Sequence, residues 1–330
     1  MTDTLAFADG IAAAAESAPQ APVVTPLVPG LTLHIDGDYL AYRASGPDDT
    51  LPGQARLNLL GIVETFRARV GAEHVVVHVT VPGSNKGERF LCATVKPYQA
   101  QRSASSKPKN QPYLQGFLLN YTGTVFRSKL WSTREADDGI GACAHHAVGT
   151  PVGYAAIATK DKDLRMLPGV HINWDTPTIC TRVPPGEYDV IGEDGKQYGL
   201  KWFFLQMLQG DAADNCPGLE MYINERGKPT KIGEKTAIKL LSGCTSTREA
   251  CAVVMNLYRE YYKDWADRFV EQASLLWMRC SAATAPVDDF ATHSGWSRIN
   301  QAFDNEIHAA VKRLNERVTA ARQSLNELQG

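Results

Sequence analysis

The sequence predicts an α/β protein in which a mostly parallel sheet with flanking helices is followed by a helical region. Strand-like and helix-like patterns alternate from residue 31 to about residue 200. Such alternation is typical of a parallel sheet with helices on both faces. Beyond residue 200 the patterns are helical only. The 330 residues, 44% of them hydrophobic, are enough for about two domains with a substantial core.

Apolar runs predict the strands. Leu31–Asp36 ends in Asp-Gly, His74–Thr80 is rich in β-branched residues, and Gly153–Thr159 is apolar throughout its middle. Shorter strands and a hairpin turn are expected at residues 170–174, 178–183 and 193–195.

Periodicity and capping residues predict the helices. Ser132-Thr133-Arg134-Glu135 has the capping-box spacing and opens a helix of small residues suited to lying close on a sheet. The expected helices are 55–69, 136–148, 200–209, 234–241, 250–262 and 266–278. Residues 307–328 carry one apolar seam. Packing of this seam on its own domain is the favoured interpretation, and a coiled coil with a partner is the alternative.

Several classes are excluded. Residues 1–27 lack a basic start and a long apolar run, so they predict a disordered or weakly helical tail and no signal peptide. No run of eighteen apolar residues is present, so no membrane-spanning helix is expected. The seven cysteines form no CxxC pair, which disfavours a disulfide framework and a zinc ribbon and favours a reducing cytoplasm.

Charge is distributed unevenly along the chain. The stretch from Lys86 to Arg134 holds nine basic residues and one acid, a net charge of +8, whereas the rest of the chain has a net charge of −10. Seven aromatic residues lie in the same stretch. A basic, aromatic stretch suits a polyanion with unpaired bases, and a solvated loop is the alternative.

Carboxylates follow the ends of the predicted strands. Asp36 ends the first strand, and Asp161 and Asp163 follow the run 153–159. Two further groups of acids stand in the first turn of the helix 136–148 and in the loop after the helix 200–209: Glu135, Asp137, Asp138, Asp211 and Asp214. Sites in open parallel sheets form at the carboxyl ends of strands, so we expect these acids to converge. So many carboxylates repel one another unless cations neutralise them, and oxygen ligands select Mg²⁺ or Mn²⁺. A pair of such ions is a device for phosphodiester cleavage.

A second signal is the segment Lys231–Ala237. A glycine directly before a helix lets the backbone approach a phosphate, and lysines 228, 231, 235 and 239 surround it. An ordinary surface helix is the alternative.

Taken together, these motifs resemble the 5′ nuclease family of flap endonucleases, and most of all bacteriophage 5′-to-3′ exonucleases. The resemblance covers residues 31–245 and rests on six segments in the family's order: Ile35-Asp36-Gly37-Asp38, Tyr98-Gln99-Ala100-Gln101-Arg102, Glu135-Ala136-Asp137-Asp138, Thr159–Leu164, Gly210–Asn215 with Pro217-Gly218, and Ile232–Ala237.

The resemblance implies a PIN-like catalytic domain over residues 28–199, with a basic arch at about 82–131 that takes a single-stranded 5′ end. It implies a helical DNA-binding region over residues 200–330, with a helix–three-turn–helix unit at about 200–241. One divalent ion would be held by Asp36, Glu135 and Asp137. The other would be held by Asp137, Asp161, Asp163 and Asp211, with Asp138 and Asp214 supporting through water. DNA would be contacted by Tyr98, Gln99, Lys231, Gly233, Glu234, Lys235 and Thr236, with K⁺ at the helix–three-turn–helix unit.

The implied function is a metal-dependent 5′-to-3′ exodeoxyribonuclease with flap endonuclease activity in DNA replication. It would use two Mg²⁺ or Mn²⁺ ions and act as a monomer in the cytoplasm of a bacterial or phage-infected cell. Its substrate would be duplex DNA with a 5′ end or flap, or an RNA–DNA hybrid. The alternatives are a PIN-type ribonuclease and a non-catalytic DNA-binding replication protein.

Three features depart from the family pattern. Thr80 stands where the family has an Asp after the second strand. Gln99 stands where it often has a lysine, and Lys96, Arg89 or Arg102 are the candidates to supply that catalytic positive charge. The insertion Leu219–Thr230 enlarges the DNA-gripping loop.

Overall fold

The computed structural model describes residues 25–100, 107–281 and 305–329. A six-stranded sheet in the order β3-β2-β1-β4-β5-β6 forms its centre, and a two-stranded sheet, β7-β8, adjoins it. Every neighbouring pair in the large sheet is parallel except β5 and β6. The strands are β1 Val28–Asp36, β2 Ala72–Thr80, β3 Arg127–Trp131, β4 Ala156–Ala158, β5 Gly169–Ile172, β6 Cys180–Val183, β7 Val190–Ile191 and β8 Gln197–Tyr198.

The α-helices are α2 Gly37–Ala44, α3 Pro52–Val70, α4 Arg89–Cys92, α5 Gln111–Leu119, α6 Ala136–Val148, α7 Leu200–Gln209, α8 Glu234–Leu240, α9 Thr247–Tyr261, α10 Trp265–Leu276 and α13 Asn305–Gln329. Two 3₁₀ turns, η1 Lys86–Glu88 and η3 Lys162–Met166, complete the set.

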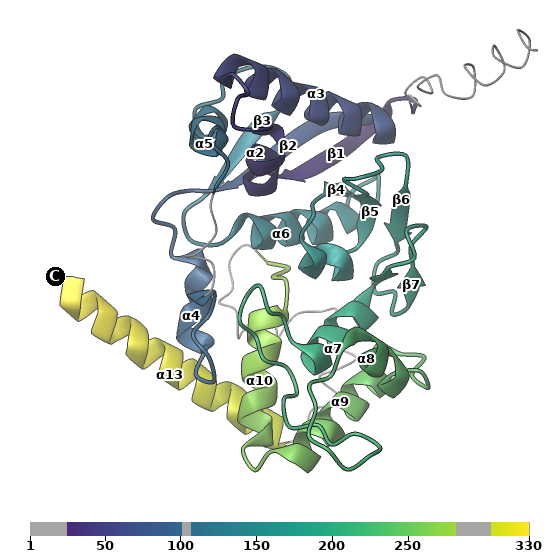
Figure 1. Ribbon diagram of the computed structural model, residues 1–330, viewed down its shortest axis with the longest axis vertical. Coiled ribbons are helices and arrows are strands. Elements are labelled where there is room, and N and C mark those ends of the chain that lie inside the picture. Colours follow the sequence, from purple (N-terminus) through teal and green to yellow (C-terminus); the bar gives the residue numbers. More distant parts are fainter. Residues whose placement is uncertain (1–24, 101–106, 282–304, 330) are drawn as a thin grey trace, which may run out of the picture.

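The sheet has a different cover on each face (Figure 1). Helices α2, α3 and α5 pack over β1 and β2 on one side, around Leu33, Ile35 and Val77. Helix α6 crosses the other face and contacts the first four strands. Because side chains alternate along a strand, the apolar odd-numbered positions of β1 face α2 and α3, and His34 faces α6.

Helix α6 lies close to its neighbours because its interior is built from small residues. A Cβ atom on Gly139 would lie 2.1 Å from the Trp131 ring, and one on Gly141 would lie 2.5 Å from the Arg279 carbonyl oxygen. The larger hydrophobic core begins at this helix and continues through α7, α9 and α10 to α13. That core crosses the expected domain boundary at residue 199, so the division into two domains remains a prediction.

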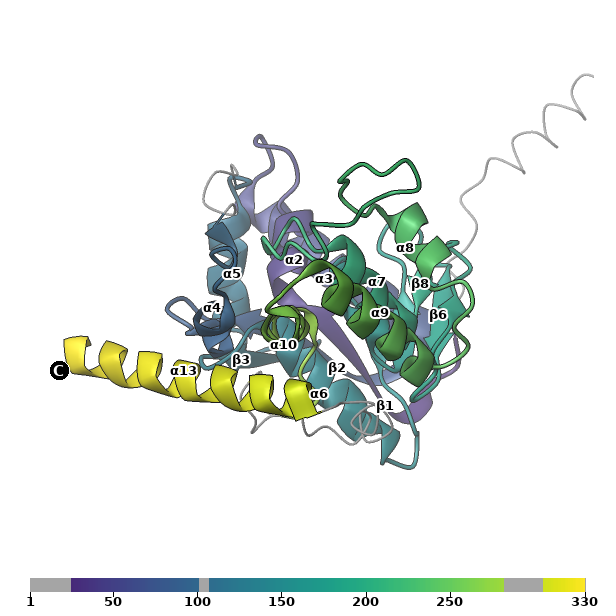
Figure 2. The same cartoon turned by 90° about the horizontal axis from the view of Figure 1, so that it is seen from below.

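The seam of α13 packs on the protein's own α10 and α4. Ile307, Leu314 and Val318 are buried in the larger core. Towards its C-terminus the helix projects from the body of the molecule (Figure 2), and Leu328 is 83% exposed. Packing on its own domain, the favoured interpretation of this seam, therefore holds for its first part.

The predicted α/β class with a mostly parallel sheet is confirmed. The hairpin turn at residues 193–195 is present between β7 and β8, where the Gly195 amide donates to the Gly192 carbonyl. Helices α2, α4 and α5 and strand β3 were not predicted. Since β3 belongs to the sheet and α5 packs on α2, the part of the expected arch that can project ends near residue 110, not residue 131. Most of the expected N-terminal tail, residues 1–24, lies outside the described residues.

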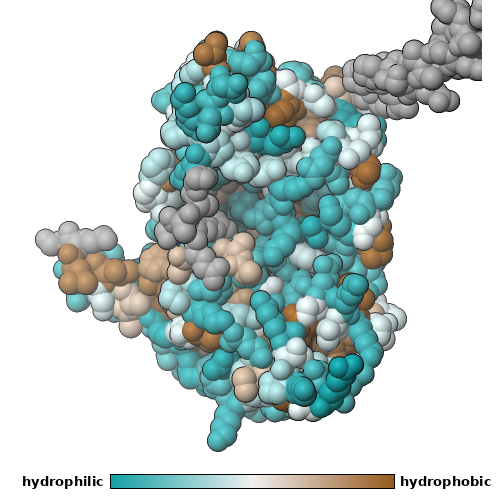
Figure 3. All heavy atoms as spheres, in the orientation of Figure 1, coloured by the Kyte–Doolittle hydropathy of each residue, from teal (hydrophilic) through white to brown (hydrophobic). Residues whose placement is uncertain are grey.

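Among the residues that the structure describes, none forms a helix long and apolar enough to cross a membrane. The face drawn in Figure 3 is largely hydrophilic, with hydrophobic residues mostly scattered. Single exposed apolar residues of this kind are ordinary on a protein surface.

Gly37 predicts a measurable packing constraint. A Cβ atom there would lie 2.5 Å from the His78 carbonyl oxygen and 2.9 Å from Val77. We expect Gly37→Ala to lower the free energy of unfolding by about 1–3 kcal/mol, in the range of overpacked cores. Urea unfolding monitored by circular dichroism measures the change.

Gly61 supplies the matched control, because it also lies in a helix, α3, and a Cβ atom there would meet nothing within 4 Å. Gly61→Ala should raise the free energy of unfolding by about 0.5–1 kcal/mol through helix propensity. Equal effects of the two substitutions would contradict the packing of α2 against β2.

Candidate metal centre

Asp36 stands at the junction of β1 and α2. It is the N-cap of α2, and its Oδ1 accepts hydrogen bonds from the backbone amides of Asp38 at 3.0 Å and Tyr39 at 3.1 Å. The Thr159 hydroxyl, which follows β4, lies 3.4 Å from Asp36 Oδ2. Asp36 is therefore fixed at the carboxyl edge of the sheet by its own helix and by the adjacent strand.

The loop after β4 carries the next two acids. The amide of Asp161 donates to Thr159 Oγ1, and Asp161 Oδ1 accepts from the amide of Asp163 at 2.9 Å. Gln206 Nε2, on α7, donates to Asp163 Oδ1 at 2.5 Å. Asp163 is thus held between the sheet edge and the helical region.

A tight loop after α7 positions Asp211 and Asp214. Asp211 and Cys216 exchange backbone hydrogen bonds of 2.7 and 2.8 Å. Gly210 has φ +73°, and a Cβ atom there would lie 2.4 Å from the Cys216 carbonyl oxygen, so the turn requires glycine. Asp211 Oδ1 accepts from the Ala213 amide and from Lys162 Nζ, both at 2.8 Å.

Helix α6 contributes Glu135 as its N-cap and Asp137 in its first turn. Glu135 Oε2 accepts from the Tyr98 hydroxyl at 3.1 Å, and Glu135 Oε1 accepts from Gln99 Nε2 at 2.9 Å. The same two side chains contact Asp214, at 3.1 and 3.2 Å. Tyr98 and Gln99, expected to bind DNA, therefore link two acids from different segments.

These acids lie close enough to perturb one another. Carboxylate oxygens of Asp163, Asp211 and Asp214 all lie within 4.8 Å of one another, and all three residues are buried. Burial, followed by the charges of Asp161 and Asp36, raises the pKa of Asp137 well above its usual value. Burial, then Asp38, raises the pKa of Asp36 to about 7. The acids from all four segments thus converge at one edge, as the sequence predicted.

The cluster suits hard divalent cations. Burial and neighbouring carboxylates also raise the pKa of Asp163 well above its usual value, so the charged cluster is unfavourable without positive charge. Asp137 Oδ1 is buried and has no hydrogen-bond partner among the described residues. Oxygen donors without sulfur or nitrogen favour Mg²⁺ or Mn²⁺. Which acids bind which ion remains a prediction.

Asp38 is an acid of this site that the sequence analysis did not assign. Its side chain hydrogen-bonds Thr80 at the end of β2, and burial raises its pKa although Thr80 lowers it. The Thr80 hydroxyl in turn accepts from the Ala136 amide at 3.0 Å. A carboxylate from the first turn of α2 thus lies beside the position where β2 carries no acid. The Asp-Gly-Asp spacing after the first strand was the available signal.

Asp138 does not support a metal through water as expected. It is fully buried, and its Oδ1 accepts from Arg89 Nη2 at 2.5 Å and from the Arg279 amide at 3.2 Å. Burial raises its pKa, but Arg89 and Arg279 outweigh that effect and hold the pKa below its usual value. Adjacent residues on a helix point about 100° apart, so Asp137 and Asp138 face different surroundings.

Of the three cationic residues expected at the reacting phosphate, the structure describes two, and both have other partners. Arg89 is 1% exposed, and its guanidinium also donates to the carbonyls of Leu275 and Trp277 at the end of α10. It therefore fits a structural role and not the expected contact with a phosphate. Lys96 forms an ion pair with Glu220, and Arg102 lies outside the described residues.

The segment around α8 presents its polar residues outward. Lys231, Gly233, Glu234 and Lys235 are exposed, and Thr236 is half-buried. Ile232 and Ala237 anchor the segment in the larger core. The five residues of this segment that were expected to contact DNA are thus at least partly accessible.

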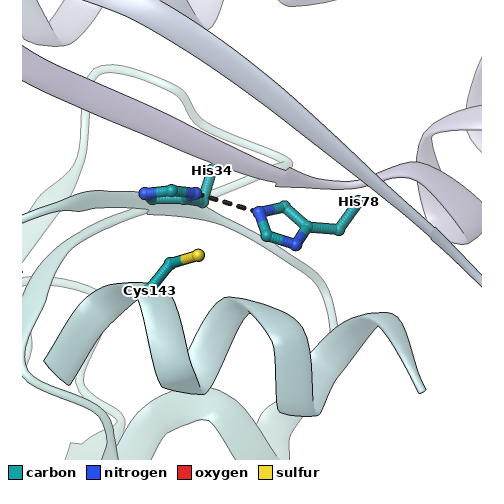
Figure 4. A group of neighbouring side chains, drawn as sticks. All are labelled: His34, His78 and Cys143. Carbon is teal, nitrogen blue, oxygen red and sulfur yellow. Dashed lines mark hydrogen bonds between the residues drawn. The ribbon is translucent and has the colours of Figure 1, made fainter. Parts of the chain in front are cut away.

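A second cluster lies between the sheet and α6 (Figure 4), beside a cavity of about 710 Å³. His34, His78 and Cys143 point toward one another there. The Trp131 indole, which can only donate, donates to His78 Nδ1 at 3.0 Å. Burial lowers the pKa of both histidines, so neutral His78 carries its proton on Nε2 and donates to His34 Nδ1 at 2.9 Å. These hydrogen bonds leave His78 no lone pair for a metal, and we assign none.

No family model and no curated protein matches the chain. Solved structures do match, and phage T5 proteins are among them. A T5 5′-exonuclease with bound zinc ions has a TM-score of 0.48 at 13% identity, covering 87% of this chain and 99% of that chain. A bacteriophage T5 flap endonuclease in a pseudo-enzyme–product complex with DNA and metal ions has a TM-score of 0.47, with the same identity and coverage.

Arg89 predicts a large stability effect. Arg89→Met leaves the buried Asp138 carboxylate without its closest cation, and we expect the free energy of unfolding to fall by about 3–5 kcal/mol. Lys96→Met breaks the exposed pair with Glu220 and should cost about 0–1 kcal/mol. Guanidinium unfolding of both variants measures the difference. Equal, small losses would show that Arg89 is not structural.

The raised pKa values predict a pH dependence. In the presence of a chelator, we expect the free energy of unfolding to fall as the pH rises from 6.5 to 8. The carboxyl groups of Asp36, Asp137 and Asp163 retain protons in the folded protein, whereas in the unfolded chain they lose them near the ordinary pKa of 3.8. The buried histidines, whose pKa values are lowered by burial, act in the opposite sense, and this effect fades as the pH rises above their ordinary pKa of 6.5. Thermal unfolding across this window measures the slope.

Two controls identify the acids as the source. Asp163→Asn removes one of the three groups, so it should flatten the fall, and excess Mg²⁺ should raise the unfolding temperature most at pH 8. A slope that neither change affects would contradict this explanation.

Proposed function

We propose that the protein is a divalent-metal-dependent nuclease that degrades DNA from 5′ ends and cuts 5′ flaps, acting in DNA replication. The observation that supports this most is that eight carboxylates from four segments converge at one sheet edge. They are those of Asp36, Asp38, Glu135, Asp137, Asp161, Asp163, Asp211 and Asp214. The order of the motifs in the sequence supports the same function.

The residues of the cluster divide the work. Asp36, Glu135 and Asp137 on one side, and Asp137, Asp161, Asp163 and Asp211 on the other, would hold two Mg²⁺ or Mn²⁺ ions, with Asp214 in support. When bound, such ions supply an activated water and stabilise the charge of the leaving oxygen. Tyr98 and Gln99 orient Glu135 and Asp214, and Thr159 orients Asp36.

Binding of the substrate would use two other parts of the chain. The exposed residues Lys231, Gly233, Glu234 and Lys235 before and within α8 would grip the backbone of duplex DNA, which carries no base information. Exposed lysines 107 and 109 and the rings of Phe90 and Tyr113 would face the single-stranded end. Tyr121 and Phe126 stack on each other near the sheet, so they serve packing and not base contacts.

The finer assignments belong to this proposal. They are a monomer with a K⁺ ion near α8, the tolerance of RNA–DNA hybrids, and the cytoplasm of a bacterial or phage-infected cell as the site of action.

A nuclease assay tests the function. With Mg²⁺ we expect 5′-flap DNA to be cut and single-stranded RNA to be left intact, and EDTA should abolish cleavage. Asp163→Asn should lower the cleavage rate by more than the roughly 10–100-fold that follows the loss of a residue that only supports a metal ligand. Streptavidin on the 5′ end of the flap should slow cleavage more than streptavidin on the 3′ end.

Other outcomes point to other functions. Full activity in EDTA, or digestion from the 3′ end, would contradict the proposal. Cleavage of RNA alone would favour the ribonuclease, and DNA binding without cleavage would favour a non-catalytic protein.

A further inference from the structure

A lysine that no motif singled out lies at the edge of the acid cluster. Lys86 belongs to the 3₁₀ turn η1, directly before α4, and has φ +50°. The turn is held by hydrogen bonds from the Asn85 amide to the Ser132 carbonyl, from the Lys86 amide to Ser84 Oγ, and from the Gly87 amide to Asn85 Oδ1. A left-handed backbone conformation of a residue other than glycine costs about 1–3 kcal/mol of stability, and such residues are found most often at functional sites.

The Lys86 ammonium is tied to the cluster through Gln99. Lys86 Nζ donates to Gln99 Oε1 at 2.7 Å. Gln99 Nε2 donates to Glu135 Oε1 at 2.9 Å and to Asp214 Oδ1 at 3.2 Å. Because the two carboxylates take both amide protons, the amide oxygen turns outward and accepts from Lys86.

Gln99 itself is fixed by its backbone. It has φ +55°, and its amide donates to the Asp214 carbonyl at 3.1 Å. Asn215, with φ +60°, donates from Nδ2 to the Pro97 carbonyl at 2.8 Å. Both ends of the contact between Lys86 and Gln99 therefore rest on backbone that is held in an unfavourable conformation.

The charge of Lys86 stays available to a ligand. Lys86 is exposed and forms no ion pair among the described residues, since its hydrogen-bond partner is a neutral amide. Lys162, another lysine beside the cluster, is bound to the Asp211 carboxylate at 2.8 Å. Lys96 is bound to Glu220, and Arg89 is buried.

We propose that Lys86 contacts the phosphate that is cut and that Gln99 is its positioning residue. This inference rests on the proposed nuclease function and names the cation of that site. As water bonds to phosphorus, a P–O bond of the phosphodiester breaks and the leaving oxygen takes up a proton. Lys86 remains an ammonium throughout and stabilises the negative charge on the non-bridging oxygens.

Substitutions of Lys86 test the contact. We expect Lys86→Met to lower the single-turnover rate on 5′-flap DNA with Mg²⁺ by about 10²–10³-fold, as for the loss of one charge-stabilising donor. The Kd for the same DNA, measured by fluorescence anisotropy in EDTA, should change less than threefold. Lys86→Arg should restore the rate to within about tenfold of the wild type. Met and Arg, like Lys, are unbranched at Cβ, so both fit the same strained backbone.

A double substitution tests the positioning role. Gln99 also holds Glu135 and Asp214, so the test compares backgrounds: if Gln99 positions Lys86, Lys86→Met should cost less of the rate in Gln99→Leu than in the wild type. Multiplied losses would overturn the role of Gln99. Lys96→Met is the control of equal charge change and should lose less than threefold in rate.

The outcomes separate this inference from the function itself. A Lys86→Met variant at the wild-type rate, or one that loses affinity without losing rate, would overturn the inference while cleavage by the wild type upheld the function. An equal loss of rate in Lys96→Met would also overturn the inference, since the change in the net charge of the protein would then explain the slower cleavage by both variants. If Lys86→Met does not fold, Lys86→Gln decides by the same measures. Absence of cleavage by the wild type would remove the function and this inference together.

Discussion

Mutual repulsion among buried carboxylates is the constraint that shapes this edge of the sheet. The same local hydrogen bond offsets this repulsion at three acids. Asp36, Asp161 and Asp211 each accept a hydrogen bond from the backbone amide two residues further on. Such bonds fix the carboxylate relative to its own loop and favour its charged form. The orientation of these three carboxylates is therefore set in part within their own segments.

Backbone strain is concentrated where the segments meet. Lys86, Gln99 and Asn215 all have positive φ. Lys86 donates to Gln99 within the basic stretch, and Gln99 and Asn215 form the hydrogen bonds that join this stretch to the Asp211 loop. The buried guanidinium of Arg89 stabilises the same region, because it joins Asp138 to the end of α10. A rigid support of this kind keeps side chains near one geometry, which a reacting centre requires.

The sheet and the convergence of the acids could be predicted from the sequence, because both depend on the direction of the chain. Parallel strands end at one edge of the sheet, so acids that follow the strands lie near one another. Side-chain direction was not accessible. Neighbours Asp137 and Asp138 received similar roles, yet one faces the cluster and the other faces Arg89. Strand β3 was missed because five residues with an irregular burial pattern carry little periodic signal. Lys86 was missed because no sequence rule places a lysine in a left-handed turn.

The basic stretch leaves and re-enters the sheet between neighbouring strands. β2 and β3 pair in parallel up to Thr80 and Trp131, and backbone bonds from Val81 to Trp131 and from Asn85 to Ser132 continue the pairing beyond the strands. Because the pairing is parallel, the excursion runs from the carboxyl end of β2 to the amino end of β3, and both of its ends are fixed by strands that are already paired. Closing such a loop costs only about 0.6 kcal/mol more for each doubling of its length. Insertions and deletions within it can therefore accumulate through evolution while the sheet stays intact.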